Sequence, residues 1–132
     1  MQLLCPEIEE ADGLILISPT HNYNVTAWMK AFIDRLYCFY IFNDERPRGS
    51  SSRLARQGRK AIIAAVGEQS TREDDIGFTL DAMRLPIEAL GYEIIDELPV
   101  IGIFDKGKVK ADTQLLDQAR KMGEKLAKEI KS

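Results

Sequence analysis

Two short polar segments of the sequence carry groups that could hold a flat, hydrogen-bonding ligand. Residues 18–24 read Ser-Pro-Thr-His-Asn-Tyr-Asn and combine hydroxyl, amide and imidazole groups with two ring side chains. Residues 67–71 read Gly-Glu-Gln-Ser-Thr, and the glycine lets the backbone approach a planar ligand closely. Backbone amides at the start of a following helix would also meet a carbonyl or an anion. The alternative is that both segments are simply tight, well-capped turns.

The cysteines and the single histidine do not suffice for a metal site. Cys5 and Cys38 stand far apart in the sequence without a Cys-x-x-Cys motif, and His21 is the sole histidine. An iron–sulfur cluster takes about four thiolates, and zinc sites usually combine several Cys or His ligands. We therefore expect no metal and interpret both thiols as buried or chemically idle, as free cysteines often are.

The two polar segments directly follow apolar runs that have the composition of strands. Residues 13–18 and 60–66 are nearly continuous in apolar side chains, which is typical of strands covered on both faces. A third run, residues 92–98 and on to 103, alternates more and suits the edge of a sheet. Ligands of open α/β sheets bind beyond the carboxyl ends of the strands, where both polar segments fall.

Three other segments repeat apolar residues at steps of three and four, as amphipathic helices do. The first covers residues 25–40, with Asn24 or Thr26 as its N-cap, and the last covers residues 115–130, capped by Asp112. Strands that alternate with helices predict a parallel sheet with right-handed crossovers.

The middle helical segment, residues 76–90, contains a proline. Pro86 should kink or split this helix because its ring clashes with the carbonyl four residues earlier, and Gly91 is suited to the position just beyond the end. Residues 43–59 interrupt the alternation with proline, glycine and a serine run, so we interpret them as a long exposed loop.

Length and composition predict one domain and exclude several kinds of partner. The chain has 132 residues, of which 45% are hydrophobic and 30% charged, as in an ordinary globular domain. A net charge of −3 gives no support for attraction to nucleic acid or membranes. No apolar run approaches the roughly 20 residues that span a bilayer, and no basic leader precedes an apolar stretch. We expect a cytoplasmic protein that binds neither nucleic acid nor membrane.

Several segments carry a resemblance to a known family. Residues 11–19 (Ala-Asp-Gly-Leu-Ile-Leu-Ile-Ser-Pro), Tyr23 and residues 29–35 (Met-Lys-Ala-Phe-Ile-Asp-Arg) resemble the central strand, loop and helix of the flavodoxin-like NAD(P)H-dependent flavin reductases. That family includes NADPH-dependent FMN reductases and iron–sulfur flavoproteins. Residues 58–67 are similar to its next strand, and residues 87–92 to the helix end before its last strand. The resemblance implies a flavodoxin-like α/β fold, a three-layer sandwich with a parallel sheet.

The same resemblance implies an oxidoreductase with FMN as cofactor and NAD(P)H as co-substrate. Electrons would pass through the flavin to a quinone, a free flavin or a similar acceptor. No side chain is implied as a catalytic acid or base, and Lys30, Asp34 and Arg35 would fix their helix. The residues implied to line the isoalloxazine ring are Pro19, Thr20, His21, Asn22, Tyr23 and Asn24 on its edge and one face, and Gly67, Glu68 and Gln69 on the other side.

The chain departs from this family at its start. Members begin with a strand, a phosphate-binding loop, a helix and a second strand, whereas this sequence starts within the helix before the third strand. The resemblance thus implies one domain over residues 1–132, shortened at the N-terminus, with the strand order 2-1-3-4-5 reduced to 3-4-5. A misassigned start codon, a separate chain that supplies the missing half, or pairing of strand 13–18 with another copy would each explain this.

Two alternatives follow for function and partners. Without the phosphate loop, the chain could be a non-catalytic or split-subunit interaction protein that keeps the fold without binding FMN by itself. Residues 36–42 are apolar and aromatic on all sides, which predicts a homodimer or higher oligomer. The side chains expected at the contact, unless they fold back onto their own sheet, are Tyr37, Phe39, Tyr40 and Phe42.

The window 44–60 carries six positive and two negative charges in an otherwise acidic chain. It is either a solvated loop or a region that attracts the 2′-phosphate of NADPH, a role that suits the donor fork of arginine. The positive residues are Arg46, Arg48, Arg53, Arg56, Arg59 and Lys60.

Overall fold

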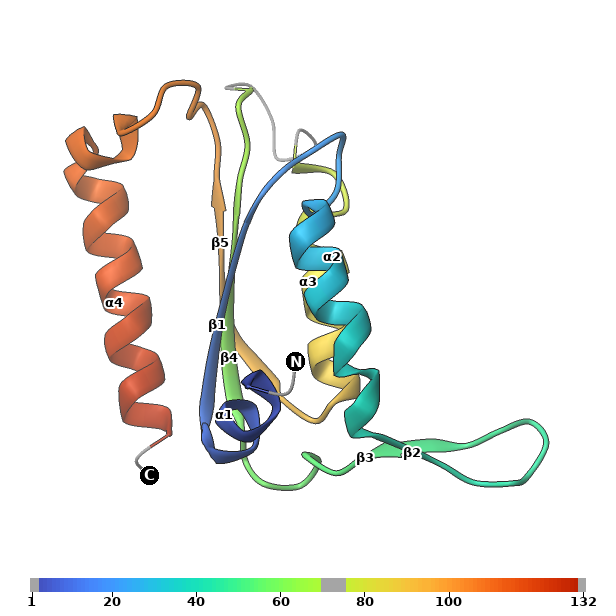
Figure 1. Ribbon diagram of the computed structural model, residues 1–132. Coiled ribbons are helices and arrows are strands. Elements are labelled where there is room, and N and C mark those ends of the chain that lie inside the picture. Colours follow the sequence, from blue (N-terminus) through green and yellow to red (C-terminus); the bar gives the residue numbers. More distant parts are fainter. Residues whose placement is uncertain (1–2, 70–75, 131–132) are drawn as a thin grey trace.

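A parallel sheet separates two layers of helices in the computed structural model, which describes residues 3–69 and 76–130 (Figure 1). The strands β1 (Gly13–Pro19), β4 (Lys60–Val66) and β5 (Glu93–Val100) lie in the order β1-β4-β5. All pairs are parallel, as the alternation of strands and helices predicts. The strands of the sheet thus confirm the three predicted runs and their order.

The helices cover both faces of this sheet (Figure 1). Helices α2 (Ala27–Arg35) and α3 (Thr79–Ala89) lie on one face, and α4 (Thr113–Glu129) lies on the other. A short helix, α1 (Leu4–Glu10), lies near the start of β1, and a 3-10 turn, η3 (Lys108–Ala111), precedes α4. No helix in residues 3–69 and 76–130 is long and apolar enough to cross a membrane.

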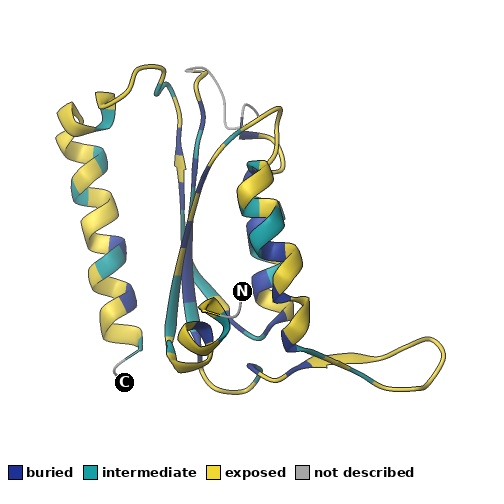
Figure 2. Cartoon of the chain, in the orientation of Figure 1, coloured by how far each residue is buried: buried dark blue, intermediate teal, exposed yellow. Residues whose placement is uncertain are grey.

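The central strand explains why the sheet needs two helical layers. Ala61, Ile63 and Ala65 of β4 are fully buried in the core cluster that includes residues of α2 and α3. Ile62, between them, belongs to the second cluster, which contains Met122 of α4. Side chains of a strand point alternately to its two faces, so a continuously apolar strand requires cover on both, and Figure 2 shows the buried residues concentrated there.

One edge of the sheet is formed by β1, as the reduced strand order 3-4-5 predicts. Among the described residues β1 pairs only with β4, and its other edge has no strand beside it. Ile15 and Ile17 of β1 are 53% and 60% exposed although they are large and apolar. The edge therefore combines unpaired backbone groups with exposed apolar side chains.

The segment after α2 contradicts the predicted helix over residues 25–40. Helix α2 ends at Arg35, a 3-10 turn η1 (Leu36–Phe39) follows, and the chain then forms β2 (Tyr40–Phe42). Strand β2 pairs antiparallel with β3 (Ser50–Ser52), so the predicted loop 43–59 contains part of a hairpin. The three-residue period of η1 places Leu36 and Phe39 on one side, and both are buried in the core.

Of the two outcomes predicted for Pro86, a kink or a split of its helix, the split does not occur. Helix α3 runs continuously from Thr79 to Ala89 with Pro86 inside it. Met83 and Ile87, both fully buried, keep this turn against the sheet, and packing outweighs the one backbone bond that proline cannot make. The carbonyl of Pro86 still accepts the amide of Leu90 over 3.1 Å.

The predicted N-caps of the first and last helices and the glycine after the middle helix are confirmed. The Thr26 hydroxyl accepts the amide of Met29 over 3.2 Å, so Thr26 rather than Asn24 caps α2. Asp112 caps α4 through the amide of Leu115. Gly91 has a φ of 99°, the left-handed conformation that ends many helices.

Candidate functional site

The two polar segments lie side by side at the carboxyl end of the sheet, as their positions after β1 and β4 predict. The amide of Thr20 donates to the carbonyl of Val66 over 2.8 Å, so the first loop starts against the end of β4. The next residue, Gly67, donates its amide to the carbonyl of Val100 at the end of β5 over 2.7 Å. Backbone hydrogen bonds therefore join the carboxyl ends of β1, β4 and β5 directly to one another.

The first loop is a tight turn with an unusual backbone. His21 and Asn24 exchange both backbone hydrogen bonds, over 2.8 and 3.1 Å. Between them Asn22 and Tyr23 have φ angles of 49° and 64°, as a type I′ turn requires. Asparagine tolerates this region, but tyrosine rarely adopts it, and such strain persists mainly where function or surrounding contacts demand it. The turn leaves the Tyr23 side chain 61% exposed.

The start of α3 holds this turn in place. The amide of Phe78 donates to the carbonyl of Tyr23 over 2.8 Å, and the hydroxyls of Thr20 and Thr79 lie 3.0 Å apart. Sequence reasoning missed Gly77, Phe78 and Thr79, since none of them resembles a ligand-binding residue. The one available signal was Gly77 in an otherwise apolar segment.

Part of the polar content of the first loop serves the fold. The buried hydroxyl of Ser18 accepts the amide of Thr26 and donates to the carbonyl of Pro19, which joins β1 to the start of α2. The Asn24 side chain accepts the amide of Val25 over 2.8 Å. Thus Asn24 and Thr20 have structural partners, whereas the side chains of His21, Asn22 and Tyr23 extend into solvent.

The second loop is closed on one side. Gly67 is buried, and a Cβ on it would stand 3.4 Å from Ile76. The carbonyls of Gly67 and Gln69 accept the amides of Ile103 and Gly102, respectively. Glu68 and Gln69 are exposed at the same end of the sheet as the first loop. Ser70 and Thr71 lie outside the described residues.

The exposed groups suit a flat heteroaromatic ligand with carbonyl and N–H edges. Imidazole, amide and carboxylate side chains of His21, Asn22, Glu68 and Gln69 offer donors and acceptors, and the Tyr23 ring offers an aromatic face. Neither segment, 18–24 or 67–69, contains lysine or arginine. These described residues therefore have the chemistry to hold a polar ring, and none of them is a cation that would bind a phosphate.

The basic window 44–60 lies at the opposite end of the sheet. Arg59 precedes β4, whose seven residues separate it by about 20 Å from the loop at Gly67. Arg59 is buried, Arg53 pairs with Glu9 over 2.9 Å, and Lys60 pairs with Glu93. Of the two interpretations of this window, these three residues do not support attraction of the 2′-phosphate of a nucleotide, because their charges have partners within the fold and lie away from the two loops.

A groove of about 650 Å³ lies on the outer side of α2 and α3. Of the predicted ring-lining residues it contains only Asn24, and its walls include the apolar residues Tyr37, Tyr40, Phe42 and Leu85. Phe39, in contrast, is completely buried in the core. The expectation that Phe39 contributes to a contact between chains is therefore wrong.

The polar face of α2 has the expected structural role. Lys30 and Asp34 form an exposed ion pair one turn apart, and Arg35 donates to the carbonyl of Ala31 over 2.8 Å.

Comparison with known proteins agrees with the fold. A family model described as flavodoxin-like fold matches residues 2–126. An FMN-dependent NADH:quinone oxidoreductase 1 from Jannaschia sp. (strain CCS1) is 28% identical over 117 residues, which cover 86% of this chain and 53% of the relative. The chain thus spans about half the length of this curated relative.

Among solved structures, an FMN-dependent NADH-azoreductase from Bacillus anthracis str. Ames Ancestor, in complex with FMN, superposes with a TM-score of 0.71. It is 15% identical, and the match covers 96% of this chain and 61% of the azoreductase. At this identity the likeness establishes the arrangement of strands and helices.

Proposed function

The chain belongs to the family of proteins with a flavodoxin-like fold, and from this membership we propose that it is an FMN-dependent NAD(P)H oxidoreductase or the flavin-ring half of one. Bound FMN would supply the redox chemistry, between a nicotinamide as hydride donor and a quinone, a free flavin or a similar acceptor. The names of the Jannaschia and Bacillus proteins, an NADH:quinone oxidoreductase and an NADH-azoreductase, support this class of reaction.

The observation that carries the proposal is the meeting of the two polar loops at the carboxyl end of β1 and β4. In this proposal residues 19–24 bind one edge and face of the isoalloxazine ring, and residues 67–69 approach its other side. The strained turn presents the Tyr23 ring to the ligand, while Gly67 keeps the backbone close. These residues bind and orient, and the proposal assigns no proton transfer to any of them.

The composition of the described loop residues leads to a specific experiment on the proposal. Each charge-assisted bond to a phosphate is worth about 1.5–3 kcal/mol, and residues 18–24 and 67–69, the described parts of the two loops, offer no Lys or Arg to make one; Arg72, farther along the second loop, lies outside the described residues. The chain should therefore bind riboflavin and FMN with affinities within about threefold of each other. Titration of each flavin, followed by quenching of its fluorescence, measures this ratio. FMN binding more than about 100-fold tighter would show a phosphate site and contradict this reading of the two loops.

Two tyrosines of equal exposure provide a matched pair of variants. Tyr23 and Tyr37 are each 61% exposed, but Tyr23 lies in the proposed ring site and Tyr37 in the groove beside α2. Tyr23→Ala should weaken flavin binding about tenfold through loss of ring stacking, whereas Tyr37→Ala should leave it unchanged. Equal losses of flavin affinity in both variants would show that the isoalloxazine ring does not bind at these loops.

A second candidate function rests on the edge of β1. In the part of the chain that the structure describes, no strand pairs with this edge, and together with the exposed Ile15 and Ile17 it suits a further strand from another chain. Such pairing would make the protein an interaction or split-subunit module without flavin binding of its own. Failure of both flavins to bind the chain, at any accessible concentration, would favour this second function.

A further inference from the structure

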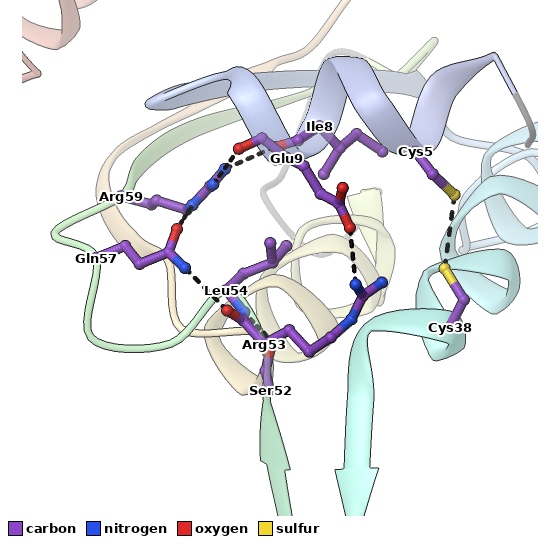
Figure 3. A network of polar contacts seen from close by, with 9 residues as sticks. All are labelled: Cys5, Ile8, Glu9, Cys38, Ser52, Arg53, Leu54, Gln57 and Arg59. Atoms are coloured by element: carbon purple, nitrogen blue, oxygen red, sulfur yellow. Dashed lines mark hydrogen bonds and ion pairs between the residues drawn. The ribbon is translucent and has the colours of Figure 1, made fainter.

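The two cysteines, which sequence reasoning interpreted as buried or idle, lie next to each other at the surface. Their Sγ atoms are 3.6 Å apart, although 33 positions separate them in the chain (Figure 3). Cys5 is half-buried and Cys38 is exposed, and both are free thiols. The expectation that the thiols are buried is therefore wrong for Cys38, and the two thiols are neighbours in the tertiary structure.

The local fold of each segment explains this placement. In α1 the buried Ile8 lies three residues after Cys5, so both side chains occupy the same inward face of the helix. In η1 the buried Leu36 and Phe39 share one side, which leaves Cys38 pointing outward. The Cys5 side chain on α1 thus lies at the edge of the core, where the Cys38 side chain on η1 comes next to it.

Two arginines keep α1 in this position. The guanidinium of Arg59 is buried and donates to the carbonyls of Ile8, Glu9 and Ala11, each over 2.6 Å, at the end of α1. Arg53 pairs with the Glu9 carboxylate and lies over the Phe39 ring, 5.2 Å from its centroid. These contacts join α1 to η1 independently of the thiols, so the two sulfurs are held as neighbours in the reduced protein.

We propose that Cys5 and Cys38 are a thiol oxidation site, at which a low-molecular-weight disulfide such as oxidised glutathione converts the pair to an intramolecular disulfide. The Cys38 thiolate attacks the glutathione disulfide and releases one glutathione; Cys5 then attacks the mixed disulfide and releases the second. The two protein thiols lose two electrons and two protons, and one glutathione disulfide is reduced to two thiols. This proposal does not depend on flavin binding.

The required movement is small. A disulfide needs its sulfurs at about 2.05 Å, so the pair must close by roughly 1.5 Å. Rotation about the Cα–Cβ bonds of two side chains at the surface, one on a seven-residue helix, can provide that distance. The exposed Cys38 is the thiol that a soluble disulfide reaches first, and Cys5 is placed to resolve the adduct.

The decisive test is the product formed with oxidised glutathione under denaturant-free conditions. The reduced chain should lose both free thiols and the mass of two hydrogens, stay a single chain on a non-reducing gel, and yield a peptide linking Cys5 to Cys38. Cys5→Ser should instead keep one glutathione on Cys38, since the resolving thiol is absent. Two stable glutathione adducts on the unaltered chain, crosslinks between chains only, or unreacted thiols would each overturn the proposal.

Thermal unfolding provides a second readout. The disulfide closes a loop of about 34 residues and should raise the unfolding midpoint by roughly 5–15 °C. Addition of a phosphine reductant should reverse the rise, and Cys5→Ser should show none. A midpoint that falls on oxidation would mean that the bond strains the native structure, which would contradict the claim that the fold prepares this pair.

Discussion

The amide of Phe78 donates to the carbonyl of Tyr23 over 2.8 Å, and this hydrogen bond joins the turn after β1 to the start of α3. The approach is possible because Gly77 lies directly against Tyr23. A Cβ on Gly77 would stand 2.5 Å from the Tyr23 carbonyl oxygen and 2.6 Å from its Cβ. The candidate site therefore depends on a glycine that contributes no side chain to it.

Gly77→Ala should move the turn and weaken the fold. The substitution combines the clash with a left-handed φ of 55°, and we expect a loss of about 2–4 kcal/mol in the free energy of unfolding, with weaker flavin binding. Gly58→Ala is the matched control, because its φ is 70° and a Cβ there meets nothing within 4 Å. If urea unfolding showed equal losses of unfolding free energy in the two variants, the left-handed φ, and not the contact with Tyr23, would be the cause.

Arg59→Met should destabilise the protein by about 3 kcal/mol or more. The buried guanidinium serves three backbone carbonyls and the Gln57 side chain, and its loss leaves buried acceptors without partners. Arg56→Met, at an exposed position of the same window, should change the free energy of unfolding by less than about 0.5 kcal/mol. Chemical denaturation compares the two, and similar stabilities would show that Arg59 is dispensable for holding α1.

Self-association stays a prediction, with its contact residues revised. We propose a homodimer or higher oligomer whose contact includes Tyr37, Tyr40 and Phe42 of the groove beside α2. Light scattering at micromolar concentration should give at least twice the 14.9 kDa of one chain, and Tyr37→Asp with Phe42→Asp should lower the mass to one chain. Phe104→Asp, at a residue 72% exposed elsewhere, should not. A wild-type mass of one chain would refute association.

The fully buried Phe39 is unsuitable for that test, since an aspartate there would unfold the core rather than separate chains.

The alkylation of Cys38 should require a higher pH than that of an ordinary thiol. Partial desolvation of the otherwise exposed thiol and its hydrogen bond with Cys5 raise the pKa of Cys38, and the charge of Arg53 opposes them. Only the thiolate reacts with iodoacetamide, so the rate of alkylation rises with pH around the pKa of the thiol. The pH at half-maximal rate should be higher for Cys38 in the native protein than for Cys38 in the urea-unfolded chain. Arg53→Gln should move the native midpoint higher still. A native midpoint at or below the denatured one would contradict the raised pKa.

The sequence sufficed for the parts of the fold that depend on local pattern. The strands at 13–18 and 60–66, the caps at Thr26 and Asp112 and the ending at Gly91 follow from periodicity and backbone preference, and the structure contains each of them. The placement of the two polar loops at one end of the sheet follows equally from the parallel arrangement of the strands.

The parts that could not be predicted depend on contacts between distant segments. Ser50–Ser52 have little preference for strands, and they form one because Tyr40–Phe42 lie beside them. Pro86 stays helical because Met83 and Ile87 are buried around it. The neighbouring positions of Cys5 and Cys38 likewise arise only when α1 and η1 pack together.

The position of β4 also determines which segments of the molecule unfold locally and which unfold only with the whole domain. It is hydrogen-bonded to a strand on each side within the described chain, and helices cover both of its faces. Its amides can reach water only when the whole sheet separates, so Ala61–Ala65 should show the slowest hydrogen–deuterium exchange, at the rate of global unfolding. The amides of α1 and of the β2–β3 hairpin should exchange through local opening, well before the central strand does.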